Sequence, residues 1–335
     1  MKIGIIGSSQ SGKTTILRIL SGNKEISGNI GVFRALDSRL EKIAGIVSAK
    51  KITYPEFIFV DLGAVSGLNK KDLSQLQEMD LFICAAGAFF SDDPKKDFEN
   101  SLTDIILFDL DIIQTRIARL QKERRGPDCD GELKILDKCQ AFISEGGLLC
   151  KAGLDKEEIK LLSGLFFLSL KPLITAIDLP EGDVSTQGDK IKRLEEYCNQ
   201  KDISCVKFFG KEELELMDLE SEEREKFSKE LGPGYNFKEN VSRAISKELD
   251  LITFFTAREK EARGWHLKSG LPAIEAAGKI HSDIKRGFIR AEVISCEDFI
   301  NHGSFHNARE AGALRLEGKD YIVQDGDVIN IKFNI

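Results

Sequence analysis

The stretch that most constrains this chain lies near its N-terminus, where "GSSQSGKT" at residues 7–14 follows the pattern G-x-x-x-x-G-K-[ST] without a mismatch. An apolar run at residues 2–6 precedes it, and isoleucines and leucines at helical spacing follow it through residue 20. Strand, glycine loop and helix in this order form the context that a phosphate-binding loop requires. The N-terminus therefore predicts a P-loop, whose backbone N–H groups converge on a phosphate at the start of a helix.

Each position of this loop has an expected role. Lys13 reaches the β- and γ-phosphates as a cation, and the Thr14 hydroxyl is offered to Mg²⁺. Asp61, which ends the apolar run "EFIFV", is placed to hold the same ion through water. Lys13 and Asp61 are therefore the catalytic candidates, and Thr14 and Asp61 are the metal candidates. The other loop residues expected to bind the nucleotide are Gly7, Ser8, Ser9, Gln10, Ser11 and Gly12.

The rest of the chain alternates between strand-like and helical patterns. Apolar runs at residues 56–63, 80–87, 170–179 and 203–209 predict buried strands, and helical patterns such as residues 190–200 lie between them. This alternation predicts an α/β domain with a mostly parallel sheet wrapped by helices. Together with the glycine loop, it gives the fold class of a P-loop NTPase.

Two regions depart from that alternation. Residues 101–125 place apolar side chains at three- and four-residue steps, "GPDCDG" interrupts them, and a helical period then resumes. We interpret residues 101–167 as a helical hairpin inserted into the α/β domain, although two ordinary surface helices would give the same pattern. From residue 251 onward, short β-rich segments enclose one helical stretch, which predicts a small α+β module over residues 251–335. The α/β domain then comprises residues 1–100 and 168–250.

Composition limits the partners of the chain. It has 335 residues, of which 31% are charged, and a net charge of −7, so any contact with nucleic acid has to come from a local patch. We therefore expect no DNA partner, whereas binding to a ribosome is compatible with this charge. The seven cysteines are scattered without zinc spacing, and no apolar stretch reaches the roughly 18 residues of a membrane span. These features favour a cytoplasmic protein with reduced thiols and no membrane contact.

The segment "KPLITAIDLPEGD" at residues 171–183 is the candidate for contact with a base. Counted from Lys171, Asp178 and Glu181 occupy the places of the Asn and Asp in the N-K-x-D motif of GTPases, and we favour this register. Counted locally, Asp178 occupies the place of that Asp. A carboxylate accepts two N–H groups of guanine, whereas adenine presents one donor there. In a third interpretation, Asp178 caps the turn of "DLPEGD" and touches no base.

The segment after the second strand bears on hydrolysis. Many GTP-binding switches carry D-x-x-G, whose glycine N–H meets the γ-phosphate, but "DLGA" at residues 61–64 puts the glycine one position early. The contact then uses the Ala64 N–H or shifts by one residue. No glutamine follows to orient a water molecule, because residues 64–66 are Ala, Val and Ser. We therefore expect an altered switch without a glutamine-based mechanism.

These motifs, in this order, resemble the Obg-related YchF/Obg-like ATPase family. The similarity covers most of the chain and is densest in "LITFFTAREKEARGW", "AAGKIHSDIKRGFIRAEVI" and "EAGALRLEGKDYIVQDGDVINIKFN". The resemblance implies a GTPase-type domain, a coiled-coil-like helical insertion and a C-terminal TGS domain of ubiquitin-like shape. It also implies hydrolysis of ATP or GTP with Mg²⁺, and contact with the ribosome or ribosomal RNA through the helical and TGS surfaces. A hydrophobic residue near Val65 would replace the catalytic glutamine.

Transferred to this chain, the resemblance implies phosphate binding by residues 7–15, Thr15 included, and contact of Asp178 and Glu181 with the base edge. The family's N-Y-P-F-x-T-I stretch has no counterpart, so the Mg²⁺-contacting threonine of the first switch is missing. Asp178 stands where the family has a base-reading Asn, and "VKFFG" stands where it has a Ser-Ala loop. Phosphate binding survives these changes, but efficient hydrolysis and sharp base selection do not follow from them.

Two functions from different classes fit these features. The first is a slow Mg²⁺-dependent hydrolase of ATP or GTP that acts as a ribosome-associated regulator of translation. The second is a catalytically degenerate adaptor, which binds a nucleotide or none and presents its helical and TGS surfaces to a partner. A small-molecule kinase is disfavoured, because nothing after the P-loop resembles a phosphoacceptor pocket or a lid.

Overall fold

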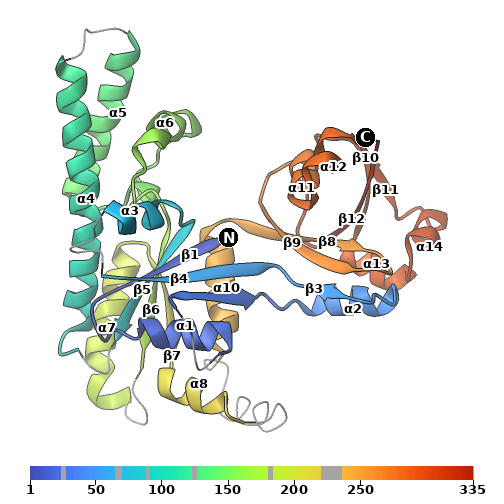
Figure 1. Ribbon diagram of the computed structural model, residues 1–335, viewed down its shortest axis with the longest axis horizontal. Coiled ribbons are helices and arrows are strands. Elements are labelled where there is room, and N and C mark those ends of the chain that lie inside the picture. Colours follow the sequence, from blue (N-terminus) through green and yellow to red (C-terminus); the bar gives the residue numbers. More distant parts are fainter. Residues whose placement is uncertain are drawn as a thin grey trace. The chain divides into compact units, whose positions relative to one another are not determined.

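The chain folds into two compact units. The first comprises Met1–Phe33 and Ile58–Ile245, and the second comprises Arg34–Phe57 and Ser246–Ile335 (Figure 1). The computed structural model describes residues 1–23, 28–64, 70–87, 91–122, 127–179, 184–219 and 236–334. Within these ranges, no helix has both the length and the apolar character needed to cross a membrane.

A six-stranded sheet forms the centre of the first unit, with its strands in the order β2-β4-β1-β5-β6-β7. The pairings from β4 through β7 are all parallel, which confirms the expected mostly parallel sheet. Every residue of β5 is buried, as expected for a central strand that is covered on both faces. The strands are β1 (Lys2–Ile6), β2 (Ile30–Arg34), β4 (Glu56–Gly63), β5 (Leu81–Gly87), β6 (Leu173–Asp178) and β7 (Ser204–Phe208).

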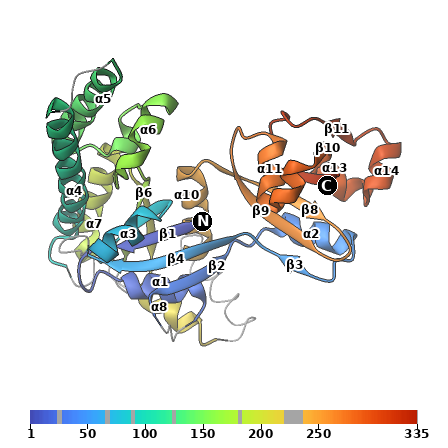
Figure 2. The same cartoon turned by 45° about the horizontal axis from the view of Figure 1, so that its top comes forward.

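Helices cover both faces of this sheet. The helices α4 and α7 share an apolar core with one face, and α1 and α8 lie on the other (Figure 2). The helices of this unit are α1 (Lys13–Ser21), α3 (Lys70–Gln77), α4 (Pro94–Lys122), α5 (Pro127–Ser144), α6 (Lys156–Leu162), α7 (Val184–Gln200), α8 (Gly210–Leu216) and α10 (Phe237–Glu248). Short 3₁₀ helices span Leu149–Lys151 and Ser163–Leu165.

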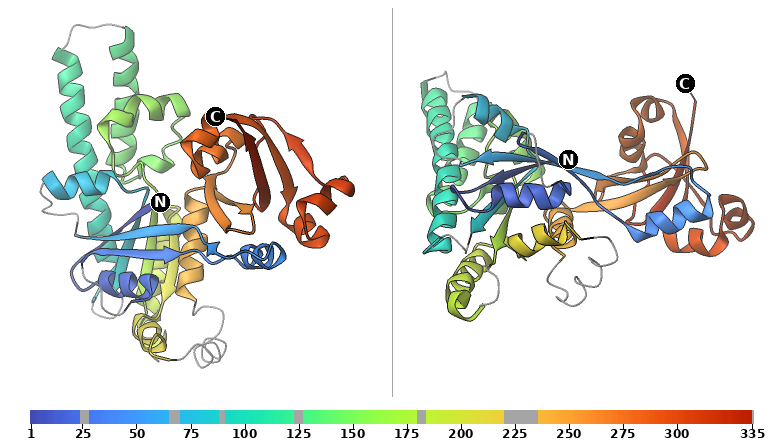
Figure 3. Two further views of the ribbon diagram at one scale, coloured as in Figure 1. Left: turned by 45° about the vertical axis from the view of Figure 1, so that its right-hand side comes forward. Right: turned by 60° about the horizontal axis from the view of Figure 1, so that its bottom comes forward.

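The helices α4 and α5 form the inserted hairpin that the sequence predicts. They run side by side and extend beyond the sheet (Figures 1 and 3). Ile113, Leu120, Leu136, Cys139 and Ile143 belong to the apolar core that joins them. This core is separate from the core that covers the sheet, so the pair is an insertion rather than two ordinary surface helices of the sheet domain.

The segment before β6 holds this insertion and α3 in place. On α4, the fully buried Asp109 accepts the N–H groups of Leu168 (2.9 Å) and Ser169 (2.8 Å) and the Ser169 hydroxyl (2.6 Å). The Lys171 ammonium donates to the carbonyl oxygens of Leu76 (2.7 Å) and Gln77 (2.6 Å) at the end of α3. Burial raises the pKa of Asp109 and lowers the pKa of Lys171 to about 8. The buried Asp109 of α4 therefore binds the backbone of this segment, and the half-buried Lys171 within the segment binds the backbone at the end of α3.

The second unit contains a mixed sheet in the order β11-β10-β12-β8-β9-β3. The pairs β8–β9 and β10–β12 are antiparallel, and β12 pairs with β8 in parallel between them. The helix α11 packs on this sheet through buried alanines, which gives the expected ubiquitin-like arrangement. The elements are α2 (Ser38–Ile46), β3 (Ile52–Thr53), β8 (Leu251–Ala257), β9 (Ala262–Lys268), α11 (Ala273–Ile280), α12 (Ser282–Arg286), β10 (Phe288–Ser295), α13 (Cys296–His302), α14 (Phe305–Glu310), β11 (Arg315–Glu317) and β12 (Asp327–Phe333).

Residues 34–57 differ from the sequence-based boundaries, which assign residues 1–100 to the nucleotide-binding domain. In the structure they belong to the second unit. The strand β3 pairs in parallel with β9, and Ile43 of α2 lies in one apolar core with Phe255 and Phe299. The reason is that an amphipathic helix has the same sequence pattern whichever core it faces. Only contacts between distant segments decide which unit receives it.

Replacing Ile43 with alanine tests this assignment. The side chain is fully buried, so we expect the cavity to lower the free energy of unfolding of the second unit by about 2–5 kcal/mol. Trp265 is the only tryptophan in the sequence and lies in this unit, so its fluorescence during urea denaturation measures the effect. Lys42→Ala, at the exposed neighbouring position of α2, is the control and should leave the midpoint unchanged. Equal midpoints for the two variants would exclude α2 from this core.

Candidate functional site

The predicted P-loop lies between the carboxyl end of β1 and the start of α1. Because β4, β5 and β6 run parallel to β1, their carboxyl ends meet at the same edge of the sheet. A hollow of about 280 Å³ opens there, which we call the P-loop pocket. It is lined by Gln10, Ser11, Gly12, Lys13, Thr14, Thr15, Gly87 and Asp178. The structure therefore brings loop residues together with residues that are far away in the sequence.

The backbone of the loop explains its glycines. Gly7 has φ +142° and Gly12 has φ +95°, conformations that residues with a Cβ rarely adopt. A Cβ on Gly7 would also lie 2.7 Å from the carbonyl oxygen of Ala85 on β5. Gly12 is the residue before α1, so its conformation directs the first turn of the helix toward the pocket. The loop geometry thus requires glycine at both ends of the motif.

Lys13 is held by the loop that precedes it. Its ammonium donates to the carbonyl oxygens of Gly7 (3.1 Å) and Ser8 (2.5 Å). Burial lowers the pKa of Lys13, and the nearby Asp61 carboxylate acts in the opposite direction. The cation therefore lies within the curve of the loop, where a phosphate would meet it together with the backbone N–H groups.

Thr14 and Asp61 lie next to each other beside the loop. The Thr14 hydroxyl donates to Asp61 Oδ2 at 3.3 Å, which brings together two oxygen ligands of the kind that Mg²⁺ prefers. The Gly63 N–H donates to Asp61 Oδ1 at 3.2 Å, and the Gly63 carbonyl accepts the Gly7 N–H at 3.3 Å. The register between β1 and β4 skips one residue here, because Ile5 faces Asp61 and Ile6 faces Gly63. This irregularity is where the structure accommodates the early glycine.

Asp178 ends β6 and lies against the loop. Its Oδ1 accepts the Gly210 N–H at 2.9 Å, and a Cβ on Gly12 would lie 3.2 Å from its Oδ2. Burial raises the pKa of Asp178 to about 6; the Gly210 hydrogen bond opposes this shift, and the Glu212 charge adds to it. Its proposed partner Glu181 and most of the turn "DLPEGD" lie in residues 180–183, which are outside the described residues. Val65 is also outside the described residues.

Sequence reasoning missed three residues of this region. Gly87, which ends β5, lies so close to the loop that a Cβ on it would be 3.1 Å from the Ser11 Cα. Gly210 and Glu212 approach Asp178 from the start of α8. A glycine at the carboxyl end of a predicted central strand was the available signal for Gly87. The contact of α8 with β6 left no local sequence signal.

The donor set fits a nucleotide with Mg²⁺. The Ser11 Oγ is buried and has no hydrogen-bond partner within the described part of the chain. The two glycines of the motif leave a backbone cradle that side chains would fill, and Thr14 and Asp61 supply hard oxygen ligands. A phosphate and its cation would therefore find partners for groups that the protein leaves available.

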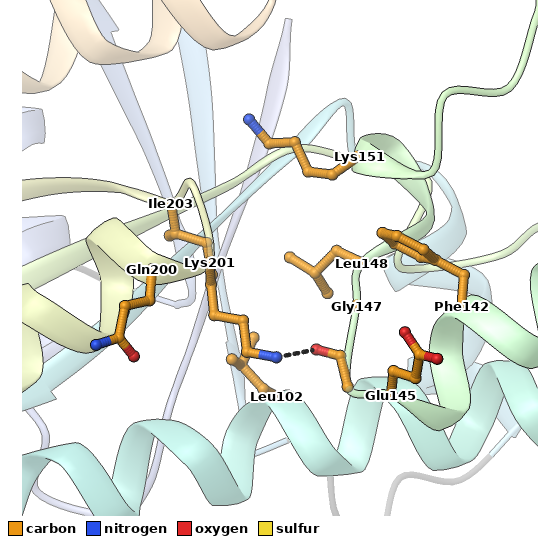
Figure 4. Close-up of a pocket in the computed structure, with 10 residues that line it drawn as sticks. Leu102, Phe142, Glu145, Gly147, Leu148, Lys151, Gln200, Lys201 and Ile203 are labelled. Carbon is orange, nitrogen blue, oxygen red and sulfur yellow. Dashed lines mark hydrogen bonds between the residues drawn. The ribbon is translucent and has the colours of Figure 1, made fainter.

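A second hollow, of about 240 Å³, lies where the hairpin meets α7 (Figure 4). The Lys201 ammonium donates to the Gly146 carbonyl at 3.0 Å, and Lys151 pairs with Asp202 at 2.7 Å. Both lysines at this hollow thus have partners within the chain, and its lining mixes apolar side chains such as Phe142 with polar ones. The P-loop pocket is the stronger candidate for a phosphate ligand.

Comparison with known proteins shows which family the chain belongs to. The YchF-GTPase_C family model, described as a protein of unknown function (DUF933), matches residues 251–334. The ribosome-binding ATPase YchF of Bacillus subtilis is 34% identical over 363 residues, which cover 99% of each chain. The protein of the same name from Haemophilus influenzae is 35% identical over 364 residues, which cover 100% of this chain and 99% of the relative. The chain belongs to the YchF family.

Solved structures agree with membership of the YchF family at the level of the fold. The Schizosaccharomyces pombe YchF GTPase superposes with a TM-score of 0.87 at 20% identity and covers 99% of this chain and 97% of that one. A GTP-binding protein from Pyrococcus horikoshii gives a TM-score of 0.63 at 19% identity over the full length of both chains. The GTPase-like fold and the family resemblance predicted from the sequence are therefore confirmed.

Exchanging a loop glycine tests the strained geometry of the pocket. Gly12→Ala should lower the free energy of unfolding by about 1–2 kcal/mol, because a Cβ is disfavoured at its positive φ and would press on Asp178. Gly131→Ala, in α5 with open space around it, is the matched control and should raise stability by up to about 1 kcal/mol. Circular dichroism during urea denaturation measures both changes. Shifts of the same sign in the two variants would contradict the loop conformation.

Proposed function

We propose that this chain binds a purine nucleotide in the P-loop pocket, hydrolyses ATP or GTP slowly with Mg²⁺, and regulates translation at the ribosome. The arrangement of Lys13 inside the loop, with Thr14 and Asp61 beside it, carries the proposal. One cation, a set of backbone N–H groups and a helix N-terminus together favour a polyphosphate over other small anions.

In this proposal, residues 7–15 bind the phosphates. Lys13 exchanges the carbonyl oxygens of Gly7 and Ser8 for phosphate oxygens, which lets a charged partner replace two neutral ones. Thr14 and Asp61 would hold Mg²⁺, which would supply positive charge to neutralise the phosphates. Asp178 contacts the base, and Glu181 is assigned to the same edge by its position in the motif.

The environment of Gly63 supports slow hydrolysis. A glycine N–H directed at the γ-phosphate would stabilise the transferring group. Here the Gly63 N–H donates to Asp61, and the Gly63 carbonyl accepts the Gly7 N–H. Both backbone groups of this glycine are therefore engaged within the protein. Phosphate binding needs the loop alone, whereas fast hydrolysis would need the Gly63 N–H to leave Asp61 and turn toward the γ-phosphate.

The names of related proteins support the ribosome as a partner. Proteins 31–35% identical over nearly the whole chain bear the name ribosome-binding ATPase YchF. Exposed apolar side chains are available for such a contact, among them Leu107 on α4 of the hairpin and Leu161 on α6. A ribosomal partner also implies a cytoplasmic protein.

The adaptor function stays as the second candidate because of the same Gly63 contacts. If Asp61 keeps the Gly63 N–H when a nucleotide is bound, the γ-phosphate gains no contact with this segment. The pocket would then hold a nucleotide without turning it over. The hairpin and the ubiquitin-like unit would act as binding surfaces only.

Lys13→Met separates the two functions. We expect the affinity for ATP and GTP to fall by about 10- to 100-fold, because a charged hydrogen bond to phosphate is lost. Calorimetric titration with and without Mg²⁺ measures binding, and phosphate release over hours measures turnover. Lys192→Met, which removes an exposed lysine from α7, is the control and should bind like the wild type.

Each outcome of this experiment points to one function. Wild-type release above the level of Lys13→Met supports the hydrolase. Binding that depends on Lys13, with release no faster than in the variant, supports the adaptor. No binding of either nucleotide by the wild type would overturn both nucleotide-dependent functions.

A further inference from the structure

One carboxyl group, that of Asp178, lines the P-loop pocket, and the charge of a second, that of Glu212, acts on it. Asp178 comes from β6 and Glu212 comes from the first turn of α8. Asp178 Oδ1 accepts the Gly210 N–H at 2.9 Å, whereas no donor from the described residues reaches Oδ2. The Glu212 Oε2 is buried and also lacks a hydrogen-bond partner among those residues. The Asp178 Oδ2, an acceptor without a donor among the described residues of the pocket, is therefore available to a ligand donor or a proton.

No described cation neutralises this pair. The Lys13 ammonium, which lines the same pocket, donates to its own loop. Glu213, the next acidic residue of α8, accepts the Phe237 N–H at 3.1 Å. Asp178 itself has its pKa raised to about 6 by burial and by the Glu212 charge. All four histidines of the chain lie beyond residue 265, so none of them belongs to this unit.

The position of Asp178 determines which part of a purine it meets. A Cβ on Gly210 would lie 2.8 Å from both carboxylate oxygens and 2.9 Å from the Thr15 methyl group, and a Cβ on Gly12 would lie 3.2 Å from Oδ2. Asp178 therefore lies beside the phosphate cradle rather than at the far end of a bound base. In a purine nucleotide, the side of the ring nearest the sugar and phosphates carries N7, followed by the group at position 6. Adenine presents an acceptor and a donor there, whereas guanine presents two acceptors.

We propose that the protonation state of Asp178, at the base-contact position assigned above, sets how strongly adenine is preferred over guanine. The inference rests on the proposed nucleotide site. An ionised Asp178 has only acceptors, so its Oδ2 accepts the 6-amino group of adenine and repels O6 of guanine, while N7 is an acceptor in both bases. A protonated Asp178 donates its O–H to N7 of either base. Discrimination against guanine is therefore strong when the carboxyl is ionised and weak when it is protonated.

The experiment measures a ratio of affinities. Dissociation constants for non-hydrolysable analogues of ATP and GTP are determined by calorimetry at fixed Mg²⁺ between about pH 5 and 7.5, a range that brackets the ordinary spread of such raised carboxyl pKa values. Taking the ratio of the GTP to the ATP constant cancels the protonation of the triphosphate and the binding of Mg²⁺, which both nucleotides share. We expect this ratio to be about tenfold or more at the upper end and to fall toward unity at the lower end.

Two variants make the test specific. Asp178→Asn keeps the shape of the side chain but does not titrate, so its ratio should be independent of pH. Glu212→Gln removes the neighbouring charge that raises the pKa of Asp178, so the midpoint of the change should move to lower pH. The second variant keeps Asp178 and therefore provides a test even where the first one fails to fold.

The outcomes are distinct. A ratio that does not change with pH, while both nucleotides bind, overturns the inference and leaves the nucleotide site intact. The same holds for a change that persists in Asp178→Asn. A ratio that rises toward low pH would show that Asp178 instead accepts N–H groups from guanine, which also overturns it. Absence of binding for both nucleotides at every pH would overturn the proposed function itself.

Discussion

The parallel pairing of β1 with β4 and β5 is the constraint on which the site depends. Because the three strands run the same way, the P-loop after β1 lies between the ends of its neighbours. The next parallel strand, β6, adds Asp178 to the same edge. The parallel pairings thus bring the P-loop, Asp61 and Asp178 to one edge of the sheet, where we propose that a nucleotide binds.

The segment from Asp61 to Gly63 shows how a sequence difference at this edge changes the contacts of the P-loop. An early glycine is accommodated by one skipped residue in the register between β1 and β4, and its backbone groups bind Asp61 and Gly7. The loop and this strand end therefore stabilise each other. The same contacts engage the Gly63 N–H, so in the proposed function the stability of the pocket and the speed of hydrolysis would oppose one another at this residue.

Sequence reasoning succeeded where a local pattern has one structural meaning. The P-loop, the parallel sheet and the hairpin α4–α5 each follow from spacing within one segment, and the structure contains all three. It did not place residues 34–57, because the apolar stripe of α2 fits either core and its partners lie more than 200 residues away, at Phe255 and Phe299. It named Asp178 but not Gly210 or Glu212, since the contact between β6 and α8 exists only in the folded chain. Glu181 stays a prediction.

Three ionisable groups of the first unit, Asp109, Lys171 and Asp178, have one feature in common. Asp109 and Asp178 accept backbone N–H groups, and Lys171 donates to carbonyl oxygens at the end of α3; in none of these contacts is the hydrogen-bond partner an opposite charge. Burial accordingly shifts each pKa toward the neutral form. Backbone dipoles can hold the neutral and the charged form of such a group in nearly the same geometry. The Gly210 N–H can donate to the carboxyl group of Asp178 whether or not that group carries a proton, as the proposed pH dependence requires.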